Sequence, residues 1–142
     1  AYQPNWYNSL INNKIHDGNF FWYYGYDAHS GLSYIEVRGV GRENGMNMGT
    51  LVRRNDLSEN TCIKLDSGSD ESSLLDLIVD DNKITGSERG IVFQTTQTSM
   101  EGVLISRTQF NDVEQEWYWR DGEAADLIHN AGEDRLLILD IE

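Results

Sequence analysis

The stretch "TLVRRNDLSENTCIKLDSG", residues 50–68, decides the fold, because two other parts of the chain follow the same pattern. They are "SLINNKIHDGNFFWYYG", residues 9–25, and "VLISRTQFNDVEQEWYWRDG", residues 103–122. Each has two apolar residues, a polar or basic pair, a polar turn, and a second strand that ends in glycine. Self-similarity along a chain is typical of architectures built from repeated units. We therefore predict three approximate repeats, over residues 8–48, 49–101 and 102–142.

Short β-branched and aromatic runs separated by turn residues predict an all-β domain. The chain has one proline, and its 13 glycines are scattered between these runs. Three repeats of about four short strands each are what a β-trefoil needs, because three such units close into a barrel. A length of 142 residues fits a single domain over residues 1–142.

Two segments leave other architectures open. Residues 70–81 and 122–131 place apolar residues at helical spacing behind a capping residue. If both segments are helices, the fold is α+β, with hairpins packed against the helices. An antiparallel barrel of the lipocalin or avidin type, built from sequential hairpins, is the third possibility.

The third repeat carries a specific motif. Gln115-Glu116-Trp117 follows a strand and a polar turn, and Asp121-Gly122 comes soon after. This arrangement resembles the ricin-type β-trefoil lectin repeat, whose hallmark is Gln-x-Trp. Phe21 and Ile63 stand approximately where that Trp falls in the first two repeats. The resemblance implies a β-trefoil that binds carbohydrate.

The segment "GNFFWYYGYDAHSG", residues 18–31, is the richest in aromatic side chains. A strand shows alternate side chains to opposite faces, so if Phe21 belongs to the core, its neighbours point outward. A sugar site needs a ring to stack on and polar groups that bind hydroxyls. Either these rings form such a site or they pack against the N-terminal "NWY" segment, residues 5–7, as a second small core. The ligand-binding residues predicted here are Phe20, Trp22, Tyr24, Tyr26, Asp27 and His29.

The segment "EWYWRDGEAAD", residues 116–126, repeats this composition at lower density. Trp117 is predicted to be core and Trp119 to share its face, while Tyr118 points the other way beside Arg120. Trp119 and Asp121 complete the predicted ligand-binding set.

The charge balance excludes some classes of partner. With 24 acidic and 11 basic residues, the net charge is -13, so nucleic acids and anionic membrane surfaces are repelled at long range. The apolar runs are shorter than the roughly 20 residues that cross a bilayer. A basic protein or a carbohydrate is the expected partner of this acidic, soluble chain.

Sites for catalysis and metal binding are weakly indicated. No catalytic motif is present, so we predict neither a catalytic residue nor a cofactor. Asp66, Asp70 and Glu71 offer oxygen ligands suited to calcium but lack the EF-hand pattern. The single cysteine, Cys62, lies in an apolar run and is expected to be buried and inert. One cysteine fits both the cytoplasm and a secreted protein without disulfides, and nothing here fixes the oligomeric state.

These observations predict a non-enzymatic, lectin-like module that binds carbohydrate by aromatic stacking and carboxylate hydrogen bonds. The first alternative is an acidic inhibitor or immunity-type protein that binds a basic protein surface. The second alternative is a barrel that carries a small apolar ligand.

Overall fold

The strands of this protein pair in parallel. The computed structural model describes residues 5–16, 33–39, 45–67 and 72–139. Within these residues every pairing between two strands is parallel. A β-trefoil and a lipocalin-like barrel are both built from antiparallel strands. The predicted β-trefoil and its barrel alternative are therefore wrong.

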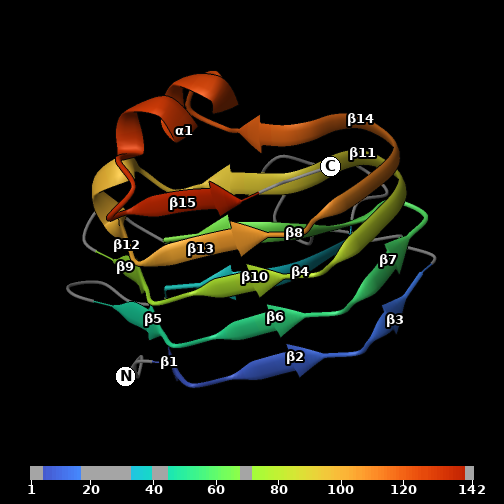
Figure 1. Ribbon diagram of the computed structural model, residues 1–142, viewed down its shortest axis with the longest axis horizontal. Coiled ribbons are helices and arrows are strands. Elements are labelled where there is room, and N and C mark those ends of the chain that lie inside the picture. Colours follow the sequence, from blue (N-terminus) through green and yellow to red (C-terminus); the bar gives the residue numbers. More distant parts are fainter. Residues whose placement is uncertain (1–4, 17–32, 40–44, 68–71, 140–142) are drawn as a thin grey trace, which may run out of the picture.

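Three parallel sheets stack their strands along one axis (Figure 1). In spatial order, sheet A contains β1 (Asn5–Trp6), β5 (Met46–Met48), β9 (Ser73–Leu75) and β12 (Met100–Glu101). Sheet B contains β15 (Leu136–Leu139), β13 (Val103–Ser106), β10 (Ile78–Asp80), β6 (Leu51–Arg53) and β2 (Ser9–Ile11). Sheet C contains β3 (Lys14–Ile15), β7 (Asp56–Ser58), β11 (Lys83–Gln94), β8 (Thr61–Asp66) and β4 (Ser33–Arg38), with β14 (Gln109–Trp119) on the other side of β11.

The chain passes through sheets A, B and C in turn and then starts the next coil, which is the arrangement of a parallel β-helix, or β-solenoid. The register shows the length of a coil. Val52 pairs with Val79, 27 positions later, and Val79 pairs with Ile105, 26 positions later. The apolar pairs that suggested three repeats lie in β2, β6 and β13 of sheet B, and the strand β10 between β6 and β13 is a further coil. The structural repeat is thus about half the predicted spacing between the second and third units.

Columns of in-register apolar side chains fill the interior of the coils. In sheet B the column is Leu10, Val52, Val79, Ile105 and Ile138. In sheet C, one column is Ile35, Ile63, Ile91 and Trp117, and the next is Val37, Leu65, Phe93 and Trp119. The Phe93 and Trp117 rings stack with centroids 6.3 Å apart. Burial of these columns is the main source of stability, because each strand alone is too short to bury an apolar face.

The corner from sheet A to sheet B and the corner from sheet B to sheet C each contain one residue in the left-handed conformation in every described coil. At the A–B corner these residues are Tyr7, Gly49, Asp76 and Gly102, and at the B–C corner they are Asn12, Arg54, Asp81 and Arg107. Gly49 has a second reason to be glycine, since a Cβ there would lie 2.5 Å from the Tyr7 ring. One left-handed residue changes the direction of the chain enough to move it from one sheet to the next.

The two segments with helical spacing behave differently. Residues 73–80 form the strands β9 and β10, so the helix considered for 70–81 is wrong in its described part. Leu74 precedes the left-handed residue Asp76 and Leu77 follows it, and both leucines are buried. Their separation by three positions therefore resembles helical spacing in the sequence. Residues 124–131 do form a helix, α1 (Ala124–Ala131), which packs on β14, β15 and the 3-10 turn η1 (Gln97–Ser99).

Helix α1 lies at the C-terminal end of the solenoid (Figure 1) and buries Leu127 and Ala131 against it. It therefore covers the apolar columns at that end, as capping elements do in solenoids. No helix in the described part of the chain is long and apolar enough to cross a membrane.

Candidate functional site

The structure describes two of the eight predicted ligand-binding residues, Trp119 and Asp121. Phe20, Trp22, Tyr24, Tyr26, Asp27 and His29 lie outside the described residues. Trp119 is half-buried against the core, and its Nε1 donates a hydrogen bond to the Thr95 carbonyl at 2.9 Å. Asp121 is exposed beside it. The Trp119 ring is thus held as a structural element at the end of β14.

The cluster around Tyr118 lies on the other side of sheet C from the main core. Cys62 and Val92 are buried together, with Tyr118 packed against them. The Arg89 guanidinium lies 3.7 Å from the centroid of the Tyr118 ring, so Arg89 stacks on that ring. Burial raises the pKa of the Cys62 thiol to about 12.

The predicted calcium ligands do not meet in the described structure. Asp70 and Glu71 lie outside the described residues, and Asp66 is a buried partner of Lys64 and Arg38, at 3.5 and 3.8 Å. Among the residues that the structure describes, no group of acidic, histidine or cysteine side chains could hold a metal ion.

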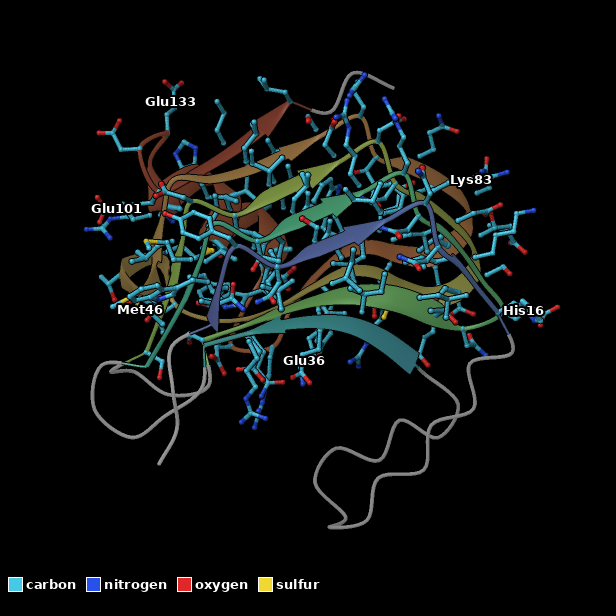
Figure 2. The ribbon with its side chains drawn as sticks, turned by 90° about the horizontal axis from the view of Figure 1, so that it is seen from below. His16, Glu36, Met46, Lys83, Glu101 and Glu133 are labelled. Atoms are coloured by element: carbon cyan, nitrogen blue, oxygen red, sulfur yellow. The ribbon has the colours of Figure 1, made fainter. Side chains whose placement is uncertain are left out.

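A pocket of about 500 Å³ opens at the N-terminal end of the solenoid. We call it the N-terminal pocket, and its lining is Asn8, Ser9, Leu10, Glu36, Val37, Arg38, Asn47 and Thr50. Figure 2 looks at the molecule from below and shows Glu36 on β4. In the described sheets, β2 and β4 are each paired on one side only, so the pocket lies between two strands with a free edge.

Polar groups of the N-terminal pocket are fixed to different degrees. Asn47 is buried, with its Oδ1 accepting a hydrogen bond from Thr50 Oγ1 and its Nδ2 donating to the Arg38 carbonyl at 3.4 Å. Glu36 pairs with Lys64 at 3.2 Å. The Arg38 side chain is 43% exposed, and its ion pair with the described residue Asp66 is long, at 3.8 Å.

Two exposed aromatic residues, Trp6 and Tyr7, directly precede the first residues that line this pocket. Trp6 is 56% exposed and Tyr7 is 73% exposed, and the chain continues from them into Asn8 and Ser9 of the pocket wall. Exposed aromatic rings beside a polar cavity offer a ligand an apolar face on which to stack.

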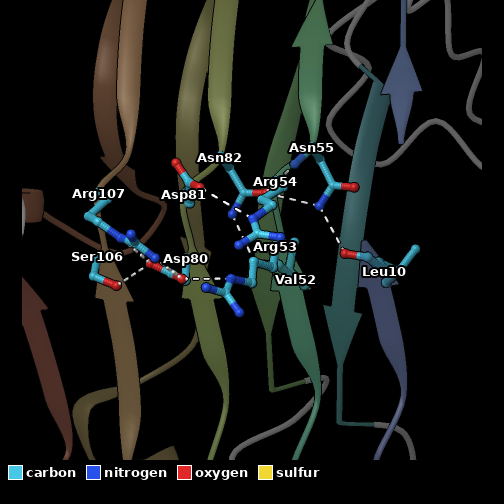
Figure 3. Close-up of polar contacts among 10 residues, drawn as sticks. All are labelled: Leu10, Val52, Arg53, Arg54, Asn55, Asp80, Asp81, Asn82, Ser106 and Arg107. Carbon is cyan, nitrogen blue, oxygen red and sulfur yellow. Dashed lines mark hydrogen bonds and ion pairs between the residues drawn. The ribbon is translucent and has the colours of Figure 1, made fainter. Parts of the chain in front are cut away.

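A ladder of Asn13, Asn55 and Asn82 lines the inside of the B–C corner, and Figure 3 shows its Asn55 and Asn82 side chains. The Nδ2 of Asn13 donates to Asn55 Oδ1 at 2.9 Å, and the Nδ2 of Asn55 donates to Asn82 Oδ1 at 2.9 Å. Asn55 Nδ2 also donates to the Leu10 carbonyl at 3.0 Å, and Asn82 Nδ2 donates to the Val52 carbonyl at 2.9 Å. The ladder satisfies buried backbone groups that a turn would otherwise leave unpaired.

A charged network lies on the outside of the same corner (Figure 3). Asp80 accepts hydrogen bonds from Arg107 Nε at 2.8 Å, Arg107 Nη2 at 2.5 Å and Ser106 Oγ at 2.8 Å. Arg53 Nε lies 3.0 Å from Asp80 Oδ2. These partners, Arg107 above all, hold the pKa of Asp80 below its ordinary value despite partial burial.

The second row of this network is more open. Arg54 Nε lies 3.6 Å from Asp81 Oδ2, and the two side chains are 53% and 36% exposed. In contrast, the Asp80 side chain is 11% exposed. The inner acid is thus buried beneath guanidinium groups that face solvent.

No protein-family model matches the chain, and neither a curated protein nor a solved structure matches it. The N-terminal pocket and the B–C corner are therefore the features of this structure that indicate a function.

Both regions were missed by the prediction from the sequence. The pocket joins segments that are far apart in the chain, so only the fold brings them together. The corner had a readable signal, since an asparagine stands three positions after the inward residue in "LINN", "VRRN" and "VDDN".

Proposed function

We propose that this protein binds carbohydrate without transforming it, and that the N-terminal pocket is its binding site. The observation that carries the proposal is an open pocket of about 500 Å³ next to the exposed rings of Trp6 and Tyr7. Pockets for small ligands have volumes of roughly 300–1,000 Å³. A sugar ring has one apolar face and a rim of hydroxyl groups, so rings and polar side chains together suit it.

The polar lining suits hydroxyl groups. Asn8 and Ser9 are exposed donors and acceptors on one wall, and Glu36 and Arg38 belong to the opposite wall. The free edges of β2 and β4 add backbone donors and acceptors that have no strand partner in the described structure. Glycoside hydrolysis needs a pair of carboxyl groups, and among the described residues the lining holds one, Glu36, which favours binding over cleavage.

The proposal is tested with a glycan array, followed by calorimetric titration of the best glycan. We expect Trp6→Ala and Asn8→Ala to weaken binding about tenfold each, which corresponds to the loss of roughly 1.4 kcal/mol. Tyr7→Asn is the suitable change at the neighbouring position, because asparagine tolerates the left-handed conformation of Tyr7. Leu139→Ala is the matched control, since Leu139 is 47% exposed at the other end of sheet B.

Two results would contradict this function. One is an array on which no glycan responds to the wild-type protein. The other is a glycan whose affinity is the same for wild type, Trp6→Ala, Tyr7→Asn and Asn8→Ala.

A second candidate function is the binding of a basic protein, and one strand favours it. β14 is paired on one side only in the described structure, and its exposed side chains include Asp112, Glu114 and Glu116. A free strand edge can accept an added strand, and acidic side chains would select a basic one. A lysine-rich peptide should then protect the β14 amides from hydrogen exchange. Unchanged exchange at low salt would refute this candidate.

A further inference from the structure

Basic side chains gather at the B–C corner, with at least one from each of four successive coils. Coil by coil they are Lys14, the pair Arg53 and Arg54, Lys83, and Arg107. These five are nearly half of the 11 basic residues in a chain whose net charge is -13. A corner with this concentration of positive charge is unexpected on a surface that is otherwise acidic.

The register of the sheets fixes the spacing of these charges. Lys14, Asp56 and Lys83 occupy one column at the start of the sheet C strands. Arg54, Asp81 and Arg107 occupy the left-handed column of the corner. Adjacent strands lie about 4.7–4.9 Å apart, so the two lysines are separated by roughly 9–10 Å, and the four coils span about 14–15 Å.

A buried acid, Asp80, holds two of the arginines in place. Asp80 anchors Arg107 through two hydrogen bonds and Arg53 through an ion pair at 3.0 Å, while its own side chain is 11% exposed. The Arg53 and Arg107 side chains are 36% and 53% exposed. Their remaining N–H groups therefore point outward from a fixed position, which lowers the entropy cost of binding an anion.

Lys14 and Lys83 are the two lysines among the five basic residues of the corner. Lys14 and Lys83 are exposed, and neither forms an ion pair with a residue that the structure describes. Asp56, between them in the column, is half-buried. Asp80 is nearly buried and Asp81 is 36% exposed, so the five cations of the corner outnumber its three acids.

We infer that the B–C corner binds a linear acidic polysaccharide, which lies along the axis of the solenoid and contacts successive coils. Carboxylate or sulfate groups suit the arginine forks. The columns of the corner contain no aromatic side chain on which a nucleic-acid base could stack. A chain with sparse charges is also repelled less by the net charge of -13 than a phosphate backbone, and at 0.15 M salt this repulsion is screened beyond about 8 Å.

This surface is separate from the N-terminal pocket, so different variants test the two. The probe is a uronic-acid hexasaccharide, compared with the same hexasaccharide after methyl esterification of its carboxyl groups. Titration calorimetry of the wild type should show binding of the acid form that weakens with added salt, and at least tenfold weaker binding of the ester. The double variant Lys14→Gln/Lys83→Gln should bind the acid form on the order of tenfold more weakly.

The control is Arg120→Gln, which removes one positive charge at the far end of β14 and should leave the affinity unchanged. Equal binding of acid and ester, or equal affinity of the double variant and wild type, would overturn the inference. A single-stranded oligonucleotide of the same charge that binds as tightly as the hexasaccharide would overturn it too, because the corner would then recognise phosphate. Trp6→Ala is expected to leave the preference for acid over ester unchanged, which separates this surface from the pocket.

Discussion

Replacing Asn55 by alanine should be among the most destabilising single changes in this protein. The Asn55 side chain accepts hydrogen bonds from the backbone N–H of Asn13 at 3.0 Å and from its Nδ2 at 2.9 Å. It donates to the Leu10 carbonyl at 3.0 Å and to Asn82 Oδ1 at 2.9 Å. Asn55 is 1% exposed, so water cannot replace these partners without entering the corner.

The size of the effect follows from the four lost hydrogen bonds. Each contributes about 1 kcal/mol net, so Asn55→Ala should lower the free energy of unfolding by about 3–4 kcal/mol. Domains of this kind are stable by roughly 5–15 kcal/mol in total. The variant should therefore fold but unfold at a much lower urea concentration.

The assay is equilibrium unfolding in urea, followed by circular dichroism at neutral pH. Asn13→Ala is the matched control, because Asn13 stands at the end of the ladder and donates only one side-chain bond to it; we expect a loss of about 1 kcal/mol. Thr108→Asn is the opposite change. Thr108 occupies the next position of the ladder, its Oγ1 is buried without a hydrogen-bond partner in the described structure, and an asparagine there should add about 1 kcal/mol.

A loss below about 1 kcal/mol for Asn55→Ala, with an unchanged dependence on urea, would refute this reasoning. It would mean that the ladder is replaceable by water and that burial of the apolar columns alone fixes the corner.

Three further predictions concern single residues. Gly90→Ala should destabilise by about 3 kcal/mol in urea unfolding, because its Cβ would lie 2.4 Å from the carbonyl oxygen of Glu116; near-neutral stability would contradict this contact. Hydrogen bonds from Arg107 lower the pKa of folded Asp80, so Asp80 stabilises fully above its unfolded pKa near 3.8 and loses this effect as pH falls through the folded value. Asp80→Asn should hence lose stability at pH 7 and converge with wild type in acid, whereas a constant gap from pH 7 to pH 2 would show that the charge is irrelevant. Cys62, with its pKa near 12, should react with a thiol reagent at pH 8 only after unfolding, and fast labelling of the native protein would disprove its burial.

The presence of strands could be predicted from the sequence, but their parallel pairing could not. Short β-branched runs and turn residues indicated a chain dominated by strands, and the apolar pairs starting at Leu10, Leu51 and Leu104 do lie in one sheet. Whether two strands pair in parallel or antiparallel depends on how the chain turns between them. A polar turn such as "RRND" is typical of a hairpin, yet here its left-handed Arg54 turns the chain into a different sheet.

The candidate sites were less predictable for the same reason. The N-terminal pocket combines residues 8–10, 36–38, 47 and 50, which no local pattern connects. The basic residues of the B–C corner are far apart in the sequence, and only the coil length shows that they lie next to each other on successive coils. Asparagine recurs three positions after Leu10, Val52 and Val79, at intervals of 42 and 27 residues, and only the second interval equals the coil length. An asparagine between polar residues also looks like any other turn.

A change at Arg54 distinguishes a role in folding stability from a role in ligand binding. Arg54 has a φ of 55°, the left-handed conformation, which asparagine, as at Asn12, or glycine adopts at lower cost, by about 1 kcal/mol. Its ion pair with Asp81 is long and exposed, so it contributes little to offset that cost. Arg54→Asn should thus leave the unfolding free energy unchanged or raise it by up to about 1 kcal/mol, while the affinity for the acidic hexasaccharide falls. If Arg54→Asn instead destabilises the protein and leaves that affinity intact, Arg54 serves the corner itself, and the cations that bind the polysaccharide are four instead of five.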